Sequence, residues 1–498
     1  MTALWHWFQE FFRGDFRLIL PEAELLLFGL GILIIDLWED AQSRFLNAVL
    51  AMMGVGFSSY TLWVLYAEAS RFGEQEAFQR AIVVDQFFLF FGMLFLAATA
   101  LVILLSARYM RIEDEDHGEY YALILFATVG MMFMASGLDL VVQFLGLETM
   151  AISFYILTGF LRRERRSNEA ALKYLLLGAF SSGILAYGFS LLYGMGRSTN
   201  IRAIAQALLA RQDTLNLAGT ADWLLMAAFV TVAAGLFFKV AAAPFHQWAP
   251  DVYEGAPTTV TAYVSVASMT ASFALLLRLF LEVFAPSHSM WTMLVAAVAV
   301  VSMTVGNFAA LTQRNVKRLL AYSSIAHVGY LLLGLVAFNA AGLIGIMYYL
   351  FAYAFMTIGA FAVIIVLRRQ GLIGDEIQDL DGLYQRSPAA AALMLIFMLS
   401  LAGIPPTAGF MGKYFIFQAL IMSRHYALAV LGALYIVPGL YYYFRIVVHT
   451  WIREPGAQAR PAVSTAQAVA LTVAVFITLA AGIYPQPFTQ LALYAIGR

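Results

Sequence analysis

TVAAGLFFKVAAAPFHQWAPDVYEGAPTT, residues 231–259, is the stretch that decides how this chain folds. It is apolar for two helical turns and then places Lys239 where a membrane-spanning helix normally carries no charge. Pro244 follows five residues later, and a proline inside a helix removes a backbone donor and clashes with the preceding turn. A buried lysine and a broken backbone are both costly in lipid, so together they indicate an ion pathway through a membrane.

The composition is that of a membrane protein. Of 498 residues, 62% are hydrophobic and 12% are charged, with a mean hydropathy of +0.80, whereas a soluble domain carries about 25% charged residues. The net charge of −1 argues against a nucleic-acid partner. The chain has no cysteine, which excludes disulfides, iron–sulfur ligation and thiol catalysis within it, and its seven histidines have no paired spacing for haem or zinc.

Apolar runs of about 18 residues or more mark candidate membrane spans. They predict an all-α polytopic membrane protein with about 14 transmembrane helices, and an even number places both termini on one side. The spans are expected near residues 18–38, 45–67, 82–106, 120–137, 138–161, 169–194, 222–248, 257–284, 289–311, 318–338, 340–368, 388–421, 425–450 and 465–485.

The loops that follow odd-numbered spans are the more basic ones. They carry fifteen Lys and Arg residues, against nine in the opposite loops and the termini. The segment LRRERRSNEA at 161–170 gives the strongest single indication of the orientation of the chain. Because cytoplasmic loops are enriched in Lys and Arg, we expect both termini on the non-cytoplasmic side of a bacterial plasma membrane.

Five basic residues fall inside the expected spans: Lys173, Lys239, Arg278, Lys413 and Arg445. We expect Arg278 to reach a membrane interface from its helix end, and Arg445 suits an interface or an interior position equally. The three lysines lie deeper in their spans, where each would cost about 2.5–3.5 kcal/mol against lipid. They should therefore face protein or water. A lone buried lysine is usually half of a structural ion pair, but three of them favour a proton relay.

Two further residues suit such a relay. Glu148 lies in the middle of a span, in VVQFLGLETMAISFYILTGF, and a Glu–Lys pair there can switch which partner stays ionised when a charge moves nearby. His327, in LLAYSSIAHVGYLLLGL, has hydroxyl side chains around it and an imidazole that titrates near neutral pH, so it is a plausible link between two halves. Asp139 is interpreted as a helix N-cap or interface residue.

A second broken span is predicted at residues 399–417, LSLAGIPPTAGFMGKYFIF, where Lys413 follows Pro405 and Pro406. Irregular backbone at membrane depth is tolerated only inside protein or beside a wet cavity, and two such spans in corresponding halves point to a transport site. Glu148 and Lys239 are 91 residues apart, and His327 and Lys413 are 86 apart. The similar spacing predicts an internal repeat.

Three stretches resemble one family of membrane proteins. KVAAAPFHQWAPDVYEGAPT, LLAYSSIAHVGY and DLDGL with LSLAGIPPTAGFMGKY are similar to the antiporter-like membrane subunits of complex I, the proton-pumping NADH:quinone oxidoreductase, and within them to the subunit N branch. The likeness covers about residues 115–450. A lysine at 413, where the subunit M branch has glutamate, favours N over M, and the absence of a long lateral helix argues against L.

The resemblance implies a fold and a set of domains. It implies two inverted five-helix repeats with discontinuous seventh and twelfth helices. The domains would be an N-terminal three-helix segment at 1–114, a first repeat at 115–285, a second, inverted repeat at 286–452, and a C-terminal helix at 453–498.

The resemblance also implies roles for the buried residues. Glu148 matches the fifth-helix glutamate and Lys239 the seventh-helix lysine that pairs with it, while Lys173 matches a sixth-helix lysine that tunes the pair. His327 matches the polar link of the tenth helix, and Lys413 matches the twelfth-helix lysine that faces the next subunit or the exit.

The implied function is proton translocation driven by electron transfer from NADH to quinone elsewhere in a complex. The resemblance places NADH, flavin, iron–sulfur clusters and quinone in other subunits and no cofactor in this chain. The implied partners are M-like, K-like, J-like and A-like membrane subunits, the lateral helix of an L-like subunit, the lipid bilayer and protons.

One position departs from the family pattern. Subunit N commonly has a lysine in its eighth helix, where this chain has Met269 in VASMTASFALLLRLF. The central connection must then use the hydroxyls of Ser265, Ser268, Thr270 and Ser272 with water, or other groups. A subunit of a multi-subunit cation/proton antiporter is the alternative function, since it shares the core motifs. A purely structural membrane subunit would leave the buried charges unexplained.

Overall fold

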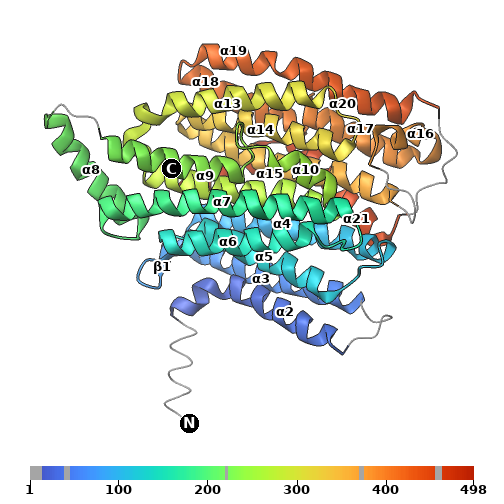
Figure 1. Ribbon diagram of the computed structural model, residues 1–498, viewed down its shortest axis with the longest axis horizontal. Coiled ribbons are helices and arrows are strands. Elements are labelled where there is room, and N and C mark those ends of the chain that lie inside the picture. Colours follow the sequence, from blue (N-terminus) through green and yellow to red (C-terminus); the bar gives the residue numbers. More distant parts are fainter. Residues whose placement is uncertain (1–13, 39–44, 219–221, 369–374, 455–462, 498) are drawn as a thin grey trace, which may run out of the picture.

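The protein is a bundle of long helices that run side by side in both directions (Figure 1). The computed structural model describes residues 14–38, 45–218, 222–368, 375–454 and 463–497. Apart from one small hairpin, every regular element among these residues is helical, which confirms the predicted fold class. The described elements are η1 (Asp15–Ile19), α2 (Leu20–Asp36), α3 (Phe45–Phe72), β1 (Gln75–Ala77), β2 (Ile82–Val84), α4 (Gln86–Ile112), α5 (Gly118–Ser136), α6 (Leu140–Thr158), α7 (Arg165–Gly196), α8 (Ile201–Ala218), α9 (Trp223–Lys239), α10 (Trp248–Gly255), α11 (Thr258–Tyr263), the π-helical η2 (Val264–Ser268), α12 (Met269–Glu282), η3 (Ala285–Ser287), α13 (His288–Ala310), α14 (Val316–Ala337), α15 (Ala340–Leu367), η4 (Ile377–Leu380), α16 (Leu383–Arg386), α17 (Pro388–Ala402), α18 (Ala408–Met422), α19 (Tyr426–Leu434), α20 (Ile436–Trp451), α21 (Thr465–Ile483) and α22 (Gln486–Ala495).

The predicted spans correspond closely to the observed helices. Within the described ranges, twelve helical stretches are long and apolar enough to cross a membrane. The predicted seventh span is divided into α9 and α10, and the predicted twelfth span into α17 and α18. A total of fourteen is reached only if each divided pair crosses as one unit, so that number stays a prediction.

Several elements were not predicted from the sequence, among them a hairpin and two helices. The strands β1 and β2 form a small antiparallel hairpin between α3 and α4. The helix α8 follows α7 and leans away from the bundle at one end (Figure 1). The short α22 comes after α21 near the C-terminus. None of them contains a long apolar run, which is the signal that predicted the spans.

Short polar side chains fix where several helices begin. Asp139 accepts a hydrogen bond from the backbone N–H of Val141 at the start of α6, which confirms its predicted role as an N-cap. Asp85 and Asn315 cap α4 and α14 in the same manner. Such a side chain satisfies a backbone donor that the first turn of a helix leaves unpaired. The close succession of α5 and α6, separated by residues 137–139, depends on the cap at Asp139.

The packing order of the central helices recurs. The helix α5 packs on α6 and α7 packs on the broken pair α9–α10, just as α13 packs on α14 and α15 packs on the broken pair α17–α18. In the pairs α5–α6 and α13–α14, a glycine allows the two helix backbones to approach closely. A side chain at Gly130 would overlap the backbone of α6, and one at Gly306 would overlap the backbone of α14. These shared features support the predicted repeats. If the first repeat crosses the membrane an odd number of times, the second repeat starts from the opposite side and is inverted relative to the first.

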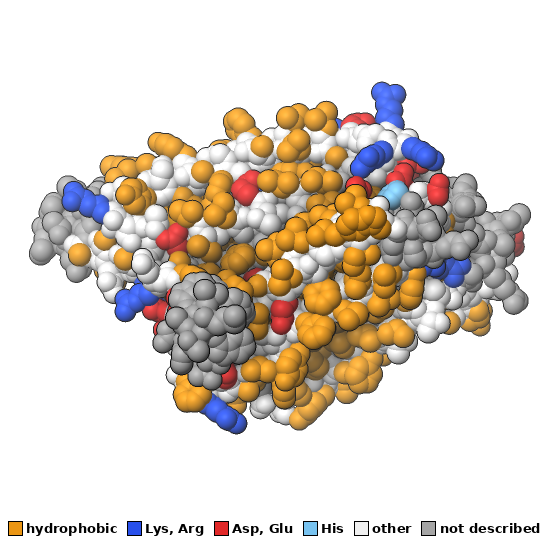
Figure 2. Space-filling view, turned by 90° about the horizontal axis from the view of Figure 1, so that it is seen from below, with side chains coloured by type: hydrophobic (Ala, Val, Ile, Leu, Met, Phe, Trp, Pro, Cys, Tyr) orange, Lys and Arg blue, Asp and Glu red, His pale blue; other side chains and the backbone are white. Residues whose placement is uncertain are grey.

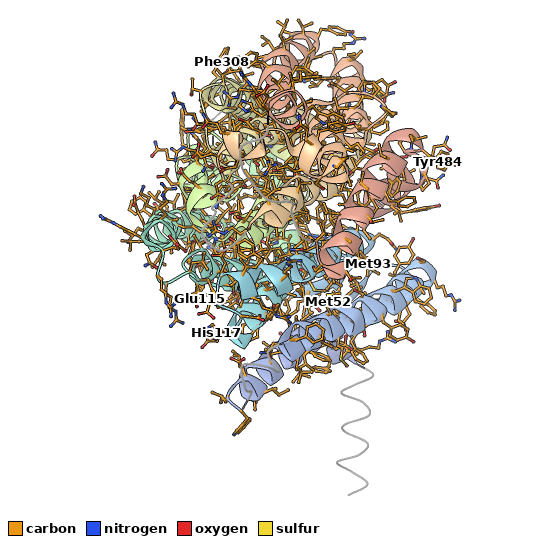
Figure 3. All side chains as sticks on the ribbon, turned by 90° about the vertical axis from the view of Figure 1, so that its right-hand side faces the viewer. Met52, Met93, Glu115, His117, Phe308 and Tyr484 are labelled. Atoms are coloured by element: carbon orange, nitrogen blue, oxygen red, sulfur yellow. The ribbon has the colours of Figure 1, made fainter. Side chains whose placement is uncertain are left out.

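Described helices of the segments predicted as domains at 1–114 and 453–498 contact the helices of these repeats. The helix α2 contacts α3 and α5, and α21 contacts α4, α15 and α18. Figure 3 shows the layer of α2 and α3 at one edge, with Met52 and Met93 on adjacent helices. Phe308 and Tyr484 point outward from the bundle (Figure 3). The domain boundaries themselves stay a prediction.

The outer surface is largely apolar between two charged ends. In the view of Figure 2, hydrophobic side chains dominate the middle of the face, and Lys and Arg gather toward the two ends of the molecule. Exposed side chains of α2 and α3 contribute to this surface, among them Leu27, Ile34, Phe57 and Trp63. A charge-poor band between charged rims is the arrangement that a bilayer requires of a membrane protein.

Arg278 and Arg445 are the two arginines inside the expected spans, and both bind to other groups of the protein. The guanidinium of Arg278 is buried and pairs with Asp85 at 2.5 Å, so its charge is satisfied inside the protein, and its position near a membrane interface stays a prediction. The carboxylate removes the need to reach water. Arg445, for which two positions were equally suited, is half-buried and donates to the carbonyl oxygens of Leu311 and Gln313, just after α13. It satisfies carbonyl groups that the end of a helix leaves unpaired.

Candidate functional site

The first break lies between α9 and α10, at residues 240–247. Trp248 reaches back across it, and its indole Nε1–H donates to the carbonyl oxygen of Phe238 at 2.9 Å. The backbone N–H of Ala243 donates to Ser302 Oγ at 2.9 Å. Side chains thus satisfy backbone groups that the interrupted helix leaves free, which is the condition for irregular backbone inside a membrane.

Lys239 is the last residue of α9, and its side chain is buried. Its Nζ lies 3.4 Å from the Tyr155 hydroxyl of α6 and 5.9 Å from the centre of that ring. Glu148 lies two turns before Tyr155 on the same face of α6, since seven residues separate them. The Tyr155 hydroxyl thus contacts the ammonium from the helix that carries the acid.

Glu148 and Lys239 interact through charge rather than direct contact. Within the described part of the chain, no ion pair of 4.0 Å or less joins them, and Glu148 Oε1 is buried without a hydrogen-bond partner. The carboxylate is still close enough to act electrostatically on the Lys239 ammonium and the Tyr155 hydroxyl. An acid with an unsatisfied oxygen beside a buried lysine is sensitive to the arrival or loss of a proton.

An aromatic cluster fixes the geometry beside Lys239. The ring of Tyr155 meets that of Tyr174 of α7 edge-on, with centroids 4.8 Å apart. Tyr174 stacks on Trp248 at 4.5 Å and an interplanar angle of 8°. These rings join α6, α7 and the start of α10. They hold the Tyr155 hydroxyl against the end of α9, which a flexible contact could not do.

Lys173 lies apart from Glu148 and Lys239. Its side chain is 43% exposed and its Nζ pairs with Glu169 at 2.9 Å and with Asp251 of α10 at 2.8 Å. Arg318 of α14 joins the same cluster, at 2.7 Å from Asp251 and 3.0 Å from Glu254. The expectation that Lys173 lies deep is wrong, because these acids and a cavity of about 240 Å³ surround it. The cluster ties together α7, α10 and α14.

The centre of the molecule contains a short π-helical segment. Residues Val264–Ser268 interrupt the helix formed by α11 and α12, with Met269 directly after them. The side chain of Ser268 lies close to the Tyr174 hydroxyl. Ser272 Oγ is buried with no hydrogen-bond partner among the described residues. A π-helical turn inside an α-helix frequently marks a functional site, and here it presents a hydroxyl to the first repeat.

A second set of hydroxyls continues from the first break toward α14 and α15. Tyr253 of α10 lies close to Ser324 of α14, and Ser324 Oγ lies 2.6 Å from the Tyr353 hydroxyl of α15. All three residues are buried. A Ser–Tyr contact of this length can carry a proton in either direction, because each hydroxyl both donates and accepts.

His327 is buried in α14 and has a partner on each ring nitrogen. Its Nδ1 lies 2.6 Å from the Tyr349 hydroxyl of α15, and its Nε2 lies 3.0 Å from the Tyr443 hydroxyl of α20. Tyr443 also bonds to Ser323. The imidazole thus bridges three helices of the second repeat, and a proton gained at one nitrogen can be lost from the other.

Lys413 is buried at the second break, residues 403–407. Its Nζ donates to the last carbonyl oxygens of α17, at 3.2 Å to Leu401 and 3.0 Å to Ala402, and lies 5.0 Å from the centre of the Tyr330 ring. The charge of Lys413 acts on His327. A cation at the C-terminal end of a half-helix complements its dipole.

At both breaks, a lysine side chain lies at the end of the first half-helix, although the two lysines differ in their place in the sequence. Lys239 comes before its break and is itself the last residue of the first half-helix. Lys413 comes after its break and reaches back to the end of the first half-helix. In both spans, a lysine therefore lies where the first half-helix ends. This explains why the order of proline and lysine differs between two otherwise corresponding segments.

The five predicted site residues divide into three places. Glu148 and Lys239 lie together at the first break, and His327 and Lys413 lie together near the second. Lys173 lies in the charged cluster instead. The sequence analysis missed the buried tyrosines between these places, and no signal distinguished them in a chain with 25 tyrosines. Among the described residues, no group of three or more His, Asp and Glu side chains could hold a metal ion.

We expect Tyr349→Phe to slow proton transfer about fivefold, because it removes a buried hydrogen bond to His327 worth about 1 kcal/mol. The measurement is the rate of proton uptake by membrane vesicles that carry the variant. Tyr348→Phe is the matched control, since the hydroxyl of Tyr348 donates to the Ala481 carbonyl instead, at 2.7 Å. Equal losses in both variants would show that the contact with His327 has no special role.

We expect Lys173→Met to retain most of the uptake rate, because partly exposed ion pairs contribute only about 0–1 kcal/mol. The same vesicle measurement tests this, with the amount of assembled protein determined on native gels. A loss as large as that caused by removing a buried lysine would instead support the tuning role that the family resemblance implies for Lys173.

The fold and the site together define a class of protein. Helices long enough to span a membrane, two broken spans with a buried lysine at each, and buried titratable groups between them are the features of an ion-translocating membrane protein. Comparison with known proteins narrows this class further.

The family model described as "NADH:quinone oxidoreductase/Mrp antiporter, TM" matches residues 137–437. NADH-quinone oxidoreductase subunit N 1 of Koribacter versatilis is 50% identical over 97% of this chain and 96% of its own. A chain of respiratory complex I from Thermus thermophilus superposes with a TM-score of 0.79 at 30% identity, covering 95% and 99% of the two chains. A chain of the Mrp complex from Dietzia shares the fold alone, with a TM-score of 0.79 at 21% identity over 95% of this chain and 96% of its own.

The chain belongs to the NADH:quinone oxidoreductase/Mrp antiporter membrane family, and within it to the NADH-quinone oxidoreductase subunit N group.

Proposed function

We propose that this chain is the proton-translocating subunit N of an NADH:quinone oxidoreductase and carries no redox centre of its own. The observation that carries this proposal is the series of buried titratable and hydroxyl groups between two broken helices. Lys239 ends the first half-helix at one break, and Lys413 binds the end of the first half-helix at the other. A structural role alone gives no reason to bury so many costly groups in one molecule.

The transfer begins at Glu148 and Lys239 in this proposal. A change of charge close to Glu148 alters how strongly the carboxylate holds the Lys239 ammonium in its charged form. The ammonium then gives up or regains a proton, and the Tyr155 hydroxyl at 3.4 Å is positioned to relay it, forming an O–H bond to the incoming proton as its own O–H bond breaks toward the next acceptor. Electron transfer elsewhere in the complex supplies the change of charge, so this chain needs no electron carrier.

The proton next passes between the repeats through hydroxyl groups. One set consists of Tyr174 with Ser268, and the other of Tyr253, Ser324 and Tyr353. Met269 contributes no titratable group at the position where a lysine is common in the family. The hydroxyl groups that take the place of the family lysine lead to the surroundings of His327. The two ring nitrogens of His327 contact tyrosines of different helices. Lys413 is the last titratable group in this series.

The wider setting is part of the same proposal. The expected partners are the M-like, K-like, J-like and A-like membrane subunits and the lateral helix of an L-like subunit, with the cofactors bound outside this chain. The expected location is a bacterial plasma membrane with both termini on the non-cytoplasmic side. The unequal distribution of basic residues, fifteen against nine, supports that orientation.

Inside-out membrane vesicles test the proposed function. NADH should drive proton uptake in vesicles with the intact chain, deletion of the chain should abolish it, and reintroduction should restore it. The chain should also migrate with NADH dehydrogenase activity on native gels. Unchanged NADH-driven uptake after deletion, with the remaining complex intact, would contradict the proposal.

A subunit of a cation/proton antiporter is the second candidate. The shared fold with a chain of the Mrp complex supports it, although at 21% identity that likeness concerns the fold alone. An antiporter would exchange Na⁺ for protons without NADH. Loss of NADH-independent, Na⁺-driven exchange in the deletion strain, with NADH-driven uptake unchanged, would favour this function over the first.

A further inference from the structure

The helix α2 carries a buried carboxyl group that takes no part in the series of buried groups described above. The side chain of Glu22 is 2% exposed, and neither of its carboxyl oxygens has a hydrogen-bond partner among the described residues. Glu22 lies about 10 Å along the candidate span Asp15–Asp36, in the layer of α2 and α3 at one edge of the bundle (Figure 3). A titratable group at this depth in a membrane-spanning helix is costly and calls for a functional explanation.

Glu22 faces α5. It shares one face of α2 with Gly29 and Asp36, because residues seven apart are about two turns apart on a helix. This face packs on α5. The backbone N–H of Gly118 donates to Asp36 Oδ1 at 3.0 Å, and a Cβ atom at Gly29 would overlap the ring of Phe126. These two contacts fix an antiparallel register between α2 and α5.

The register brings Ser136 close to the level of Glu22. Ser136 comes eighteen residues after Gly118, which is about five full turns, so both lie on the face of α5 that meets α2. Glu22 comes fourteen residues before Asp36, and its side chain is directed toward the start of its helix. The Oγ of Ser136 is also buried with no hydrogen-bond partner among the described residues. Two polar side chains without partners thus occupy the same end of the contact between α2 and α5.

No basic side chain of the described ranges pairs with Glu22. The elements packed on α2 are η1, α3 and α5, and Arg17 pairs with Glu68 at 2.8 Å while Arg71 is exposed in the last turn of α3. Besides Glu22, the charged residues of α2 and these elements are Asp15, Arg17, Glu24, Asp36, Glu68, Arg71 and Glu119. Their tyrosines are Tyr60 and Tyr66, which are exposed or partly exposed, and Tyr120 and Tyr121, which lie in the first turn of α5.

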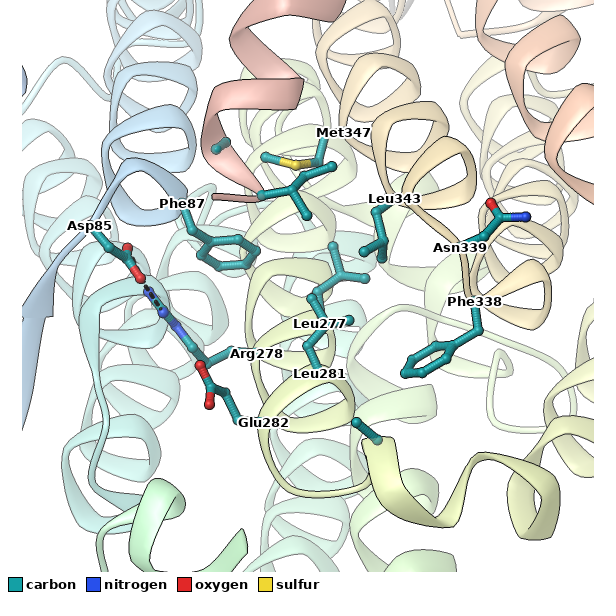
Figure 4. Close-up of a pocket in the computed structure, with 13 residues that line it drawn as sticks. Asp85, Phe87, Leu277, Arg278, Leu281, Glu282, Phe338, Asn339, Leu343 and Met347 are labelled. Carbon is teal, nitrogen blue, oxygen red and sulfur yellow. Dashed lines mark hydrogen bonds and ion pairs between the residues drawn. The ribbon is translucent and has the colours of Figure 1, made fainter. Parts of the chain in front are cut away.

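Two other buried charges show how ion pairs neutralise charge inside this chain. Arg278 pairs with Asp85 at 2.5 Å (Figure 4), and Lys317 pairs with Asp375 at 3.2 Å. Glu22 has no such partner within the part of the chain that the structure describes. An isolated ionised carboxylate is so costly in apolar surroundings that the group takes up a proton instead.

We propose that Glu22 is a proton-binding site separate from the relay, and that the bound proton holds α2 against α5. A protonated carboxyl group is uncharged and has one O–H donor, for which the Ser136 hydroxyl is an acceptor on α5. Binding forms an O–H bond on Glu22 as an O–H bond of hydronium breaks. Loss of the proton leaves a charge in the contact, so this end of α2 separates from α5 until water reaches the carboxylate. None of the relay residues takes part, so the inference does not depend on the proposed function.

Dicyclohexylcarbodiimide, an apolar reagent that adds to protonated carboxyl groups, tests this site in membranes that contain the assembled complex. The acid proton moves to one nitrogen of the reagent, the carboxyl oxygen bonds to its central carbon, and the acyl group then shifts to the other nitrogen to give a stable N-acylurea. Peptide mass spectrometry should find severalfold more adduct on Glu22 than on Glu24. Glu24 is the matched control on the same helix, because it is partly exposed and accepts a hydrogen bond from Thr61 Oγ1 at 2.9 Å.

Two outcomes of this labelling would overturn the proposal. Equal amounts of adduct on Glu22 and Glu24 would show that burial does not keep a proton on Glu22. Protection of Glu22 by Na⁺ at constant pH would show that a metal cation, and not a proton, occupies the site.

A thiol reporter measures the contact itself, whether or not the carbodiimide reaches the buried acid. The chain has no cysteine, and Leu25 is fully buried on α2, about one turn after Glu22. The reaction of Leu25→Cys with N-ethylmaleimide should rise severalfold more steeply with pH than that of Leu25→Cys combined with Glu22→Gln, because glutamine has no acidic proton to lose. Both proteins carry the same thiol, so its own titration cancels. Identical pH profiles in the two complexes, with assembly determined on native gels, would overturn the proposal.

Discussion

Lys239→Met is expected to lower NADH-driven proton uptake roughly tenfold or more, because a positioned proton-transfer group typically contributes about 10²–10⁴-fold to a rate. Methionine is unbranched and apolar, so it fills the space of the lysine stem without its charge. Quinone reductase activity should fall together with uptake, since the two are coupled in the proposed function. The measurement is uptake by inside-out vesicles, with assembly determined on native gels.

Lys239→Arg separates charge from proton release. Arginine keeps the positive charge beside Tyr155 and Glu148, but it is not deprotonated in proteins. It should therefore assemble normally and still fail to support uptake. Normal pumping by an assembled complex with Lys239→Met would refute the relay assignment and leave Lys239 with a structural role at the contact with Tyr155.

Gly409→Val is expected to remove most of the assembled protein from the membrane. A Cβ atom at Gly409 would overlap the carbonyl oxygen of Ser400 on the other side of the second break. Overpacking costs about 1–3 kcal/mol or more, and a loss of one or two kcal/mol changes the ratio of folded to unfolded protein by a factor of about 5–30. The measurement is the amount of this chain in the complex on native gels.

Gly183→Val is the matched control for this substitution. Gly183 lies inside α7, and a Cβ atom there would have no neighbour within 4 Å. The same residue types are exchanged in both variants, so any difference reports the packing at the second break. Equal amounts of assembled complex in the two variants would mean that the break tolerates a larger residue and that its geometry is less constrained than the structure indicates.

The sequence was sufficient to predict the spans and both breaks. An apolar run of membrane length and a proline within it are local signals, since they depend on lipid and backbone chemistry rather than on distant contacts. The same is true of Asp139, whose capping role follows from the residue type and the start of an apolar run. A Glu–Lys pair at Glu148 was also anticipated from the buried charges, but only the family resemblance named Lys239 as the partner.

The contacts between helices could not be predicted in this way. Tyr155, Tyr349 and Tyr443 look like any other aromatic residue of a membrane helix, and their role depends on which helix packs opposite them. Lys173 was misplaced for the same reason, because its partner Asp251 lies 78 residues away. The buried pair of Arg278 and Asp85 joins residues 193 apart. Local patterns carry no information on such distances.

The contact between α21 and the second break bears on how the protein is made. A side chain at Gly482 would overlap the carbonyl oxygen of Pro406, and Ala481 accepts the hydrogen bond of Tyr348. The irregular segment 403–407 is thus supported by a helix that leaves the ribosome about sixty residues later. The contacts that α21 makes with the second break can therefore form only after both repeats have been synthesised.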